Sequence, residues 1–176
     1  MQLSSLLPAP CALTWEEVSI TPEQIAIFVR SALPSGACPR CGFHSTRVHS
    51  HYQRTLADLP WQGSPAKLYW RSRKFFCDNL LCPQGIFTER LPEVAVSYGR
   101  KTCRMADMLC AVGFACGGEG GARLAAQLAM PASADTLLRA MRRALLPATE
   151  TPRVLGVDDW AFLRGQRYGT ILCDLE

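Results

Sequence analysis

Cys38-Pro39-Arg40-Cys41-Gly42 and the later pair Cys77 and Cys82 say most about how the N-terminal half of this chain folds. Two residues separate the first pair of cysteines, four separate the second, and strand-forming sequence lies between the pairs. This layout is typical of a zinc ribbon, in which four thiolates bind one Zn²⁺ tetrahedrally. Gly42 allows the backbone to turn back toward the metal. Such a closed site would be structural and would stabilise a segment too small to fold alone.

Other interpretations of these cysteines stay open at this point. The four could be small buried residues or a redox pair, and His44, His49 and His51 could replace a cysteine as ligands. The chain has nine cysteines, an odd number, and no secretory leader, so a disulfide framework is not expected. The remaining cysteines have no spacing that pairs them, and we interpret them as core or incidental: Cys11, Cys103, Cys110, Cys116 and Cys173.

The composition is that of a globular protein. The 176 residues, 48% hydrophobic and 19% charged, suffice for one ordinary domain or two to three small ones, and they exclude a disordered or collagen-like chain. The longest apolar stretch, from Met108 to Cys116, is too short to span a bilayer. We therefore expect a soluble, cytoplasmic protein without a membrane partner.

Positive charge is concentrated in the middle of the chain. The whole chain has a formal net charge of +4, whereas residues 40–104 carry eleven Lys and Arg against four Asp and Glu, a net charge of +7. A local basic patch favours a polyanionic partner such as DNA. An ordinary solvated surface is the alternative.

Residues 37–92 are expected to form the zinc-ribbon domain, preceded by a lead-in over residues 1–36. In the lead-in, Thr21-Pro22-Glu23-Gln24 resembles a helix start and predicts a short helix that ends near Leu33. In the ribbon, the clearest strand runs from Ala66 to Phe76. Its alternation places Leu68 and Trp70 on one face, and the other face, with the neighbouring strand, offers candidate DNA contacts: Arg47, His49, Tyr69, Arg71 and Arg73. A solvated strand face is the alternative for these residues.

Residues 98–146 change to a helical period. A first helix is expected to stop at the glycine run 117–121, a second to cover residues 122–130, and a third to cover residues 134–146 with Ser133 as its N-cap. Two short helices joined by a tight turn suggest a helix-turn-helix, although any helical hairpin shows this pattern. The last helix supplies further candidate DNA contacts: Ser133, Thr136, Arg139, Arg142 and Arg143.

Two adjacent carboxylates, Asp158 and Asp159, lie within the apolar stretch from Val154 to Phe162, which follows an expected linker over residues 147–152. This stretch predicts a buried strand paired with residues 168–175. A divalent cation could compensate one buried carboxylate, and only one can face a given metal because successive strand residues point to opposite faces. The alternative is a strand-end turn with both side chains in water. Two strands do not make a domain, so we expect the chain to be cut within one.

Several phrases occur in this order: Cys38-Pro-Arg-Cys41-Gly42, Arg47-Val-His-Ser50, Arg54-Thr-Leu-Ala-Asp-Leu-Pro-Trp61, Arg73-Lys-Phe-Phe-Cys77, Ile86-Phe-Thr-Glu-Arg-Leu-Pro92, Gly120-Gly-Ala-Arg-Leu124, Thr136-Leu-Leu-Arg139 and Val154-Leu-Gly-Val-Asp-Asp-Trp-Ala161. With them, residues 36–176 resemble a bacterial insertion-sequence transposase with an N-terminal zinc ribbon, a helix-turn-helix and a DDE catalytic domain of RNase H-like fold. The resemblance implies an α+β chain: a small β-rich zinc ribbon, an all-α helix-turn-helix over residues 98–146, and the first hairpin of an RNase H-like domain over residues 153–176.

The resemblance also implies functional residues and partners. Cys38, Cys41, Cys77 and Cys82 would be the zinc ligands, and Asp158, with Asp159 as second choice, would be the first catalytic carboxylate. Mg²⁺ would bind only in a complete catalytic domain, and without the second Asp and the Glu we expect no strand cleavage by this chain alone. The expected partner is the double-stranded DNA of transposon ends, and a homo-oligomer could form. The alternative functions are a stand-alone DNA-binding regulator without catalysis and, third, a ribbon that binds protein.

Overall fold

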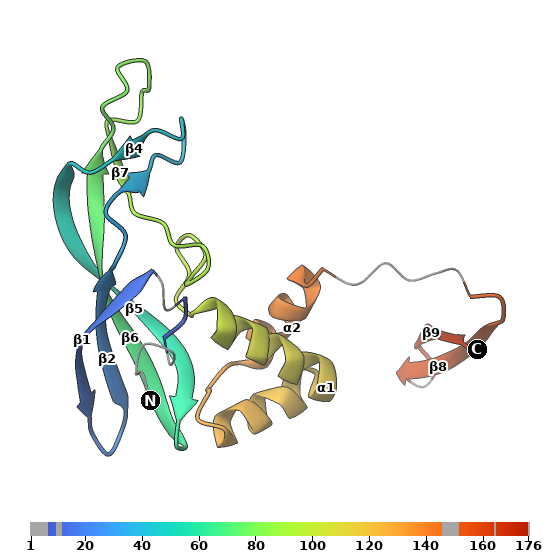
Figure 1. Cartoon of the computed structure of the whole chain (residues 1–176). Coiled ribbons are helices and arrows are strands. Elements are labelled where there is room, and N and C mark those ends of the chain that lie inside the picture. The colour runs from blue at the N-terminus through green and yellow to red at the C-terminus, as the bar shows by residue number, and fades with distance from the viewer. Residues whose placement is uncertain (1–6, 10–11, 146–151, 164, 176) are drawn as a thin grey trace. The chain divides into compact units, whose positions relative to one another are not determined.

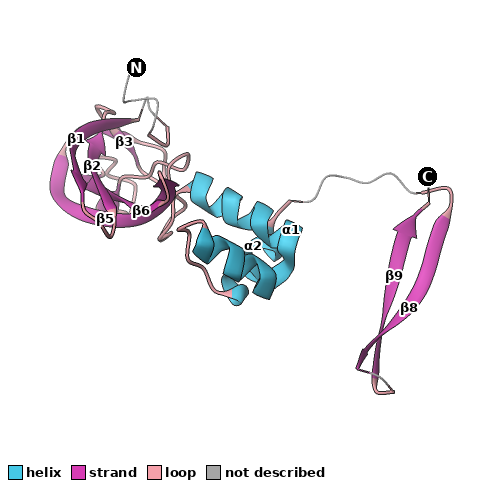
Figure 2. Ribbon diagram, turned by 90° about the horizontal axis from the view of Figure 1, so that it is seen from below, coloured by secondary structure: helices cyan, strands magenta, loops and turns pink. Residues whose placement is uncertain are grey.

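The computed structural model describes residues 7–9, 12–145, 152–163 and 165–175 (Figures 1 and 2). The chain divides into two compact units, residues 1–144 and 145–176. Figure 2 shows that strands and helices occupy separate stretches of the chain. The expected linker and Cys11 lie outside the described residues, apart from Pro152 at the linker's end.

A five-stranded sheet forms the first part of the larger unit. Its order is β1-β2-β6-β5, with β7 also paired to β6. Only the β2–β6 pair is parallel, and the other pairs are antiparallel. The strands are β1 (Leu13–Ile20), β2 (Ile25–Ser31), β5 (Val48–Trp61), β6 (Ser64–Phe76) and β7 (Ile86–Thr88).

The helix predicted from Thr21 to Leu33 is wrong, because these residues form a turn followed by β2. Thr21 and Gln24 close the turn, in which the N–H of Thr21 donates to the Gln24 carbonyl and the Gln24 N–H donates to the Thr21 hydroxyl oxygen. Residues 25–29 are then mostly branched and apolar, and they pair with the parallel strand β6. The same residue types that cap helices thus build a tight turn here, and the lead-in belongs to the ribbon's sheet.

The β5–β6 hairpin is the longest feature of this sheet (Figure 1). Gln62 and Gly63 join its strands with φ angles of 47° and 79°, as a tight hairpin turn requires. Leu56, Leu68 and Trp70 are fully buried in the sheet's main core. The predicted alternation holds in this half of β6, and further along Phe75 rather than Phe76 is the buried residue.

Two helices follow the sheet: α1 (Cys103–Gln127) and α2 (Ala134–Arg143). Gly117 interrupts α1 with a φ of 69° and a ψ of −168°, while the other residues of the glycine run stay helical. The predicted break between a first and a second helix is therefore confirmed, as a kink at Gly117. The Ser133 hydroxyl oxygen accepts from the N–H of Thr136, which confirms Ser133 as the N-cap of α2.

The glycines of α1 allow α2 to approach closely. A Cβ built on Gly121 would lie 2.7 Å from Cδ1 of Leu137, and one on Gly113 would lie 3.0 Å from the Met141 side chain. Leu137 is fully buried against α1 in a core that also contains Leu109. Within the glycine run, Gly117 therefore makes the predicted break, and Gly121 contributes to the surface on which α2 packs.

A buried carboxylate fixes the start of α1 to the sheet. Asp58 of β5 accepts hydrogen bonds from the Thr102 hydroxyl (2.7 Å) and from Nε of Arg104 (2.8 Å). Thr102 is the N-cap of α1, and its N–H donates to the Ala57 carbonyl. Because Asp58 is only 2% exposed, this ion pair is a specific link between strand and helix.

The smaller unit contains the antiparallel hairpin of β8 (Leu155–Leu163) and β9 (Arg167–Asp174). The strand expected to be buried is exposed here: Val157 is 63% exposed and Leu172 is 64% exposed. A two-stranded hairpin has no second layer to cover its apolar side chains. In the described part of the chain, neither helix is long and apolar enough to cross a membrane.

Candidate metal centre and nucleic-acid interface

The first cysteine pair lies on a small hairpin of β3 (Gly36–Ala37) and β4 (His44–Ser45). The N–H of Cys38 donates to the Phe43 carbonyl, and the N–H of Gly42 donates to the Cys38 carbonyl. Gly42 has a φ of 72°, so the turn that brings Cys41 back toward Cys38 uses the conformation that glycine adopts most easily.

The second pair lies between β6 and β7. Cys77 directly follows β6, and its N–H donates to the Gly85 carbonyl. The N–H of Cys82 donates to the Asn79 carbonyl, while the Asn79 side chain accepts from the N–H of Leu81. These bonds shape the longer spacing into a second knuckle that faces the first.

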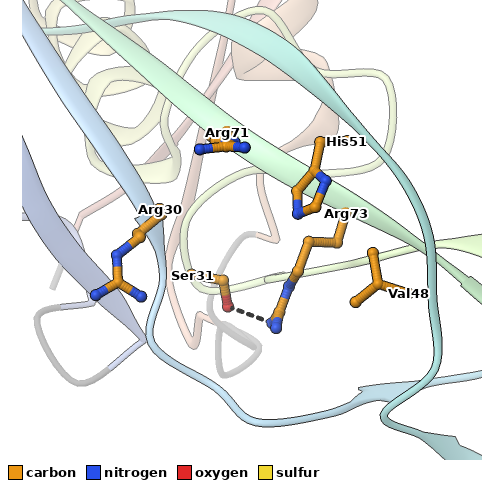
Figure 3. A pocket seen from close by; sticks show the side chains of 6 residues that line it. All are labelled: Arg30, Ser31, Val48, His51, Arg71 and Arg73. Carbon is orange, nitrogen blue, oxygen red and sulfur yellow. Dashed lines mark hydrogen bonds between the residues drawn. The ribbon is translucent and has the colours of Figure 1, made fainter.

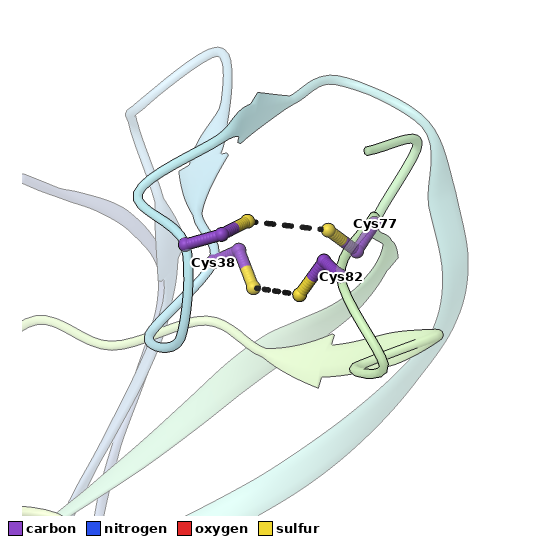
Figure 4. Close-up of side chains that lie close together, drawn as sticks. Cys38, Cys77 and Cys82 are labelled. Atoms are coloured by element: carbon purple, nitrogen blue, oxygen red, sulfur yellow. Dashed lines mark hydrogen bonds between the residues drawn. The ribbon is translucent and has the colours of Figure 1, made fainter. Parts of the chain in front are cut away.

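The four Sγ atoms of Cys38, Cys41, Cys77 and Cys82 all lie within 4.8 Å of one another (Figure 4). Cys38 and Cys82 are 4.0 Å apart at sulfur, and Cys41 and Cys77 are 3.6 Å apart. A tetrahedral zinc with Zn–S bonds of about 2.3 Å requires sulfurs about 3.8 Å apart. The donor set and its spacing therefore fit Zn²⁺, and no histidine belongs to the described cluster.

The thiols of this cluster differ in acidity. A backbone hydrogen bond from Phe43 lowers the pKa of Cys41 to about 7, whereas desolvation raises the pKa of Cys77 to about 12. At neutral pH, Cys41 supplies a thiolate readily, and binding of a metal to Cys77 displaces a proton.

A small apolar base supports the cluster. Phe75 and Phe87 are buried beside Cys38, with ring centroids 5.7 Å apart. Gly36 permits this contact, since a Cβ there would lie 2.7 Å from the Phe75 ring. Phe75, at which the alternation of buried and exposed residues in β6 is interrupted, thus packs against the metal site.

Known proteins provide an independent comparison for this region. Residues 34–82 match the family model of the zinc-finger of transposase IS204/IS1001/IS1096/IS1165. No curated protein and no solved structure matches the chain significantly. The matched segment contains all four clustered cysteines, so the chain carries a transposase-type zinc ribbon with a site for structural Zn²⁺. This ribbon suggests a transposase-related function and nucleic-acid binding in general.

Two predicted DNA contacts of the ribbon, Arg47 and His49, both pack against the ring of Phe76. The guanidinium of Arg47 lies 4.3 Å from the centroid of Phe76, and the ring of His49 lies 4.9 Å from it. Arg47 also pairs with Asp78, and its side chain is 60% exposed. This exposed group can reach a phosphate if it leaves or shares its carboxylate partner.

The three contacts predicted on β6 differ in their surroundings. Tyr69 stacks on Phe28 with centroids 4.9 Å apart, and Arg71 is exposed. Arg73 instead pairs with Glu89, a carboxylate that is 2% exposed, and donates to the Leu33 carbonyl at 2.7 Å. Most donors of Arg73 are therefore already used within the protein.

The predicted contacts of α2 lie along its exposed side. Arg139, Arg142 and Arg143 are exposed, and Arg139 is 3.9 Å from Asp135 one turn earlier. Ser133 and Thr136 are joined at the helix start, where their hydroxyl oxygens are 3.0 Å apart.

The acidic pair lies on β8, apart from the zinc ribbon in the sequence. Asp158 accepts from the N–H of Asp159, and Asp159 accepts from the Thr170 hydroxyl at 2.9 Å. Both residues are exposed. Among the described residues, the clustered metal-binding groups include neither aspartate.

Sequence reasoning missed the roles of Asp58 and Glu89. Both are buried carboxylates that each bind an arginine from a distant part of the chain, Arg104 and Arg73 respectively. The only available signal was at Asp58, which lies among apolar residues, where an unpaired charge would be costly. Glu89 lies between Thr88 and Arg90 and gave no such signal.

Proposed function

We propose that this chain is the DNA-binding part of an insertion-sequence transposase and that it binds the terminal inverted repeats of its element. The observation that carries the proposal is the four-cysteine ribbon over residues 34–82, which matches the transposase zinc-finger model. The net charge of +7 over residues 40–104 supports a polyanionic partner.

In this proposal the zinc ribbon positions phosphate contacts rather than performing chemistry. A rigid metal site holds the strand ends that carry Arg47 and His49, so the two side chains meet DNA without a large loss of conformational entropy. Contacts to phosphates fix register and orientation on the duplex.

The helices would supply the second contact area. The hairpin of α1 and α2 acts as a helix-turn-helix in which α2 is the recognition helix, with Arg139, Arg142 and Arg143 toward DNA. The exposed arginines and the tight packing that fixes α2 through Leu137 support this assignment.

Within the same proposal, Asp158 is the first carboxylate of a DDE catalytic site of RNase H-like fold. This assignment is supported by the exposed position of Asp158 on β8, the first strand of an antiparallel hairpin. In such a site, Mg²⁺ activates the attacking oxygen when bound, and the carboxylate holds it in position. Because we expect no strand cleavage by this chain alone, the test uses a transposase in which this segment is joined to a complete catalytic domain. There Asp158→Asn should remove Mg²⁺-dependent strand cleavage and Asp159→Asn should retain it, and the reverse result would assign the role to Asp159.

DNA binding is tested by fluorescence anisotropy with the zinc-loaded full chain. The probes are a duplex of the element's terminal repeat and a scrambled duplex of equal composition, each titrated at several salt concentrations. We expect tighter binding to the repeat and a linear fall of log affinity with log salt. Equal affinity for both duplexes, or no binding, would contradict the proposal.

Variants of single cysteines separate metal-dependent binding from general effects. We expect Cys41→Ser to lose zinc and repeat binding together, because Cys41 belongs to the cluster. Cys116→Ser is the matched control, since Cys116 is an exposed cysteine outside the cluster, and it should bind as the parent chain does.

A further inference from the structure

A pocket lined mainly by basic residues lies on the sheet (Figure 3). None of the four clustered cysteines lines it. Its volume is about 290 Å³, and it is lined by Arg30, Ser31, Val48, His51, Arg71 and Arg73. Three arginines and a histidine line this pocket, and no carboxylate is among the described residues that line it. Basic groups without acidic ones in a hollow indicate an anionic ligand.

Strand register, rather than chance contact of mobile side chains, brings these residues together. Arg30 on β2 is the register partner of Arg71 on β6, and His51 on β5 is the partner of Arg73. All four therefore share one face of the sheet. Like charges on directly opposed residues destabilise a sheet, so an anion bound between Arg30 and Arg71 would relieve the repulsion of this pair.

The existing carboxylates leave one positive charge uncompensated. Arg73 is neutralised by the buried Glu89, and Arg30 lies 3.7 Å from Glu16 in a solvent-exposed pair. Arg71 makes no ion pair among the residues that the structure describes. Its guanidinium is available to a ligand and can bind two oxygens of one oxyanion at once.

Ser31 adds a hydroxyl donor at the base of the pocket. Its Oγ accepts from Arg73 at 3.0 Å and from the N–H of Leu33 at 3.3 Å. These two donors use its acceptor capacity, and the hydroxyl hydrogen has no acceptor in the described part of the chain. Ser31 is 6% exposed, so this leftover donor is held within a built site rather than at the open surface.

We propose that this pocket binds a phosphate group, with Arg71 as its main ligand and Ser31 and His51 as further donors. The cavity is at the small end of the range for ligand sites, which suits a phosphate better than a whole cofactor. The phosphate could belong to a DNA backbone or to a free phosphate ester. The DNA source rests on the proposed function, whereas the pocket's affinity for phosphate does not.

The first test titrates inorganic phosphate into the zinc-loaded full chain and follows backbone amides and arginine Nε–H signals by NMR. We expect saturable shifts at Ser31, His51 and Arg71 in the parent chain, and their loss in Arg71→Gln. Lys67→Gln is the matched control, because Lys67 is an exposed cation on the same strand outside the pocket. Unchanged shifts in Arg71→Gln, or equal loss in both variants, would overturn the proposal.

The second test identifies the source of the phosphate from the salt dependence of duplex binding. If the pocket takes a DNA phosphate, Arg71→Gln should lower the slope of log affinity against log salt by about 0.9, as expected for one lost contact. Arg71→Gln could instead lose phosphate binding while its slope of log DNA affinity against log salt equals that of Lys67→Gln. In that case the pocket takes a free phosphate ester. If the parent chain binds phosphate but no DNA, the proposed function fails while the pocket stands.

Discussion

The two ends of the β5–β6 hairpin are held by different means. At one end, Leu56, Leu68 and Trp70 belong to a core to which thirteen of the described residues contribute. At the other end, the described residues form a buried cluster of only Cys38, Phe75 and Phe87, with Cys77 and Cys82 partly buried against it. Three buried residues bury too little apolar surface to offset the ordering of two knuckles, so the second end depends on bonds to a metal.

The comparison shows where along β6 stabilisation by apolar burial gives way to stabilisation by the metal site. The side chains of β6 alternate regularly to Ser72, which is fully buried, and then Phe75 turns to the cysteine cluster. Arg73 lies at this crossover, and its ion pair with Glu89 joins β6 to the segment that follows β7. The cysteine cluster therefore lies at the far end of the sheet, and we expect the other end of the sheet to stay folded without the metal.

Zinc removal should have the largest effect on stability, and the loss of structure should be confined to the cysteine end of the β5–β6 hairpin. Chelation removes about 10–16 kcal/mol of apparent binding free energy at neutral pH. We expect amides of residues 36–45 and 76–88 to lose protection from hydrogen exchange, while those of residues 66–70 keep it. Metal analysis should show about one zinc per chain before chelation.

The same experiment has a clear contrary outcome. If the whole sheet loses protection together when zinc is removed, the two ends are not independent. Cys82→Ser should reproduce the effect of chelation, and Cys173→Ser, which changes an exposed cysteine outside the cluster, should not.

The structure around the cysteine end of the β5–β6 hairpin was predicted better from the sequence than the structure around its apolar end. The ligands Cys38, Cys41, Cys77 and Cys82 follow from spacing, because each knuckle is a local structure whose residues are close in the chain. Local signals failed at Thr21, where a helix-capping residue type closes a turn. There the parallel pairing with β6, a contact across about forty residues, determines the structure.

Buried ion pairs were the other feature that the sequence could not show. Asp58 and Arg104 are 46 residues apart, and only the completed fold brings them together. The spacing of residues along a strand or helix contains no information about such partners. The predicted DNA contacts of the ribbon and of α2, and the role of Asp158, stay predictions.

Removing the Asp58 carboxylate should give the second-largest effect. Asp58→Ala leaves Arg104 and the Thr102 cap without their acceptor, which we expect to destabilise the larger unit by about 3 kcal/mol. Denaturant unfolding measures this change, and zinc content should stay at one per chain because the cluster is unaffected. Asp107→Ala is the control, because Asp107 is an exposed acid on α1, the helix that contains Arg104. It should change the free energy of unfolding by less than about 0.5 kcal/mol.

A smaller effect is expected where α2 packs on α1. In Gly121→Ala the new methyl would lie 2.7 Å from Leu137, which is fully buried and has little room to move. We expect a loss of about 1–3 kcal/mol by denaturant unfolding. Gly120→Ala is the control, since its nearest contact is 3.7 Å away, and it should stabilise the helix slightly. Equal effects of the two variants would mean that the helices do not pack this closely.

The smallest effect, and a stabilising one, is expected at the end of α1. Ala129 has a φ of 57°, and the N–H of Met130 donates to the Ala125 carbonyl, an arrangement in which glycine is the usual residue. Ala129→Gly should therefore raise stability by up to about 1 kcal/mol, because it removes the strain of a left-handed alanine. Ala126→Gly, within the helix and exposed, should lower stability by about as much. If both variants destabilise the protein alike, the turn before α2 does not have this left-handed conformation in solution.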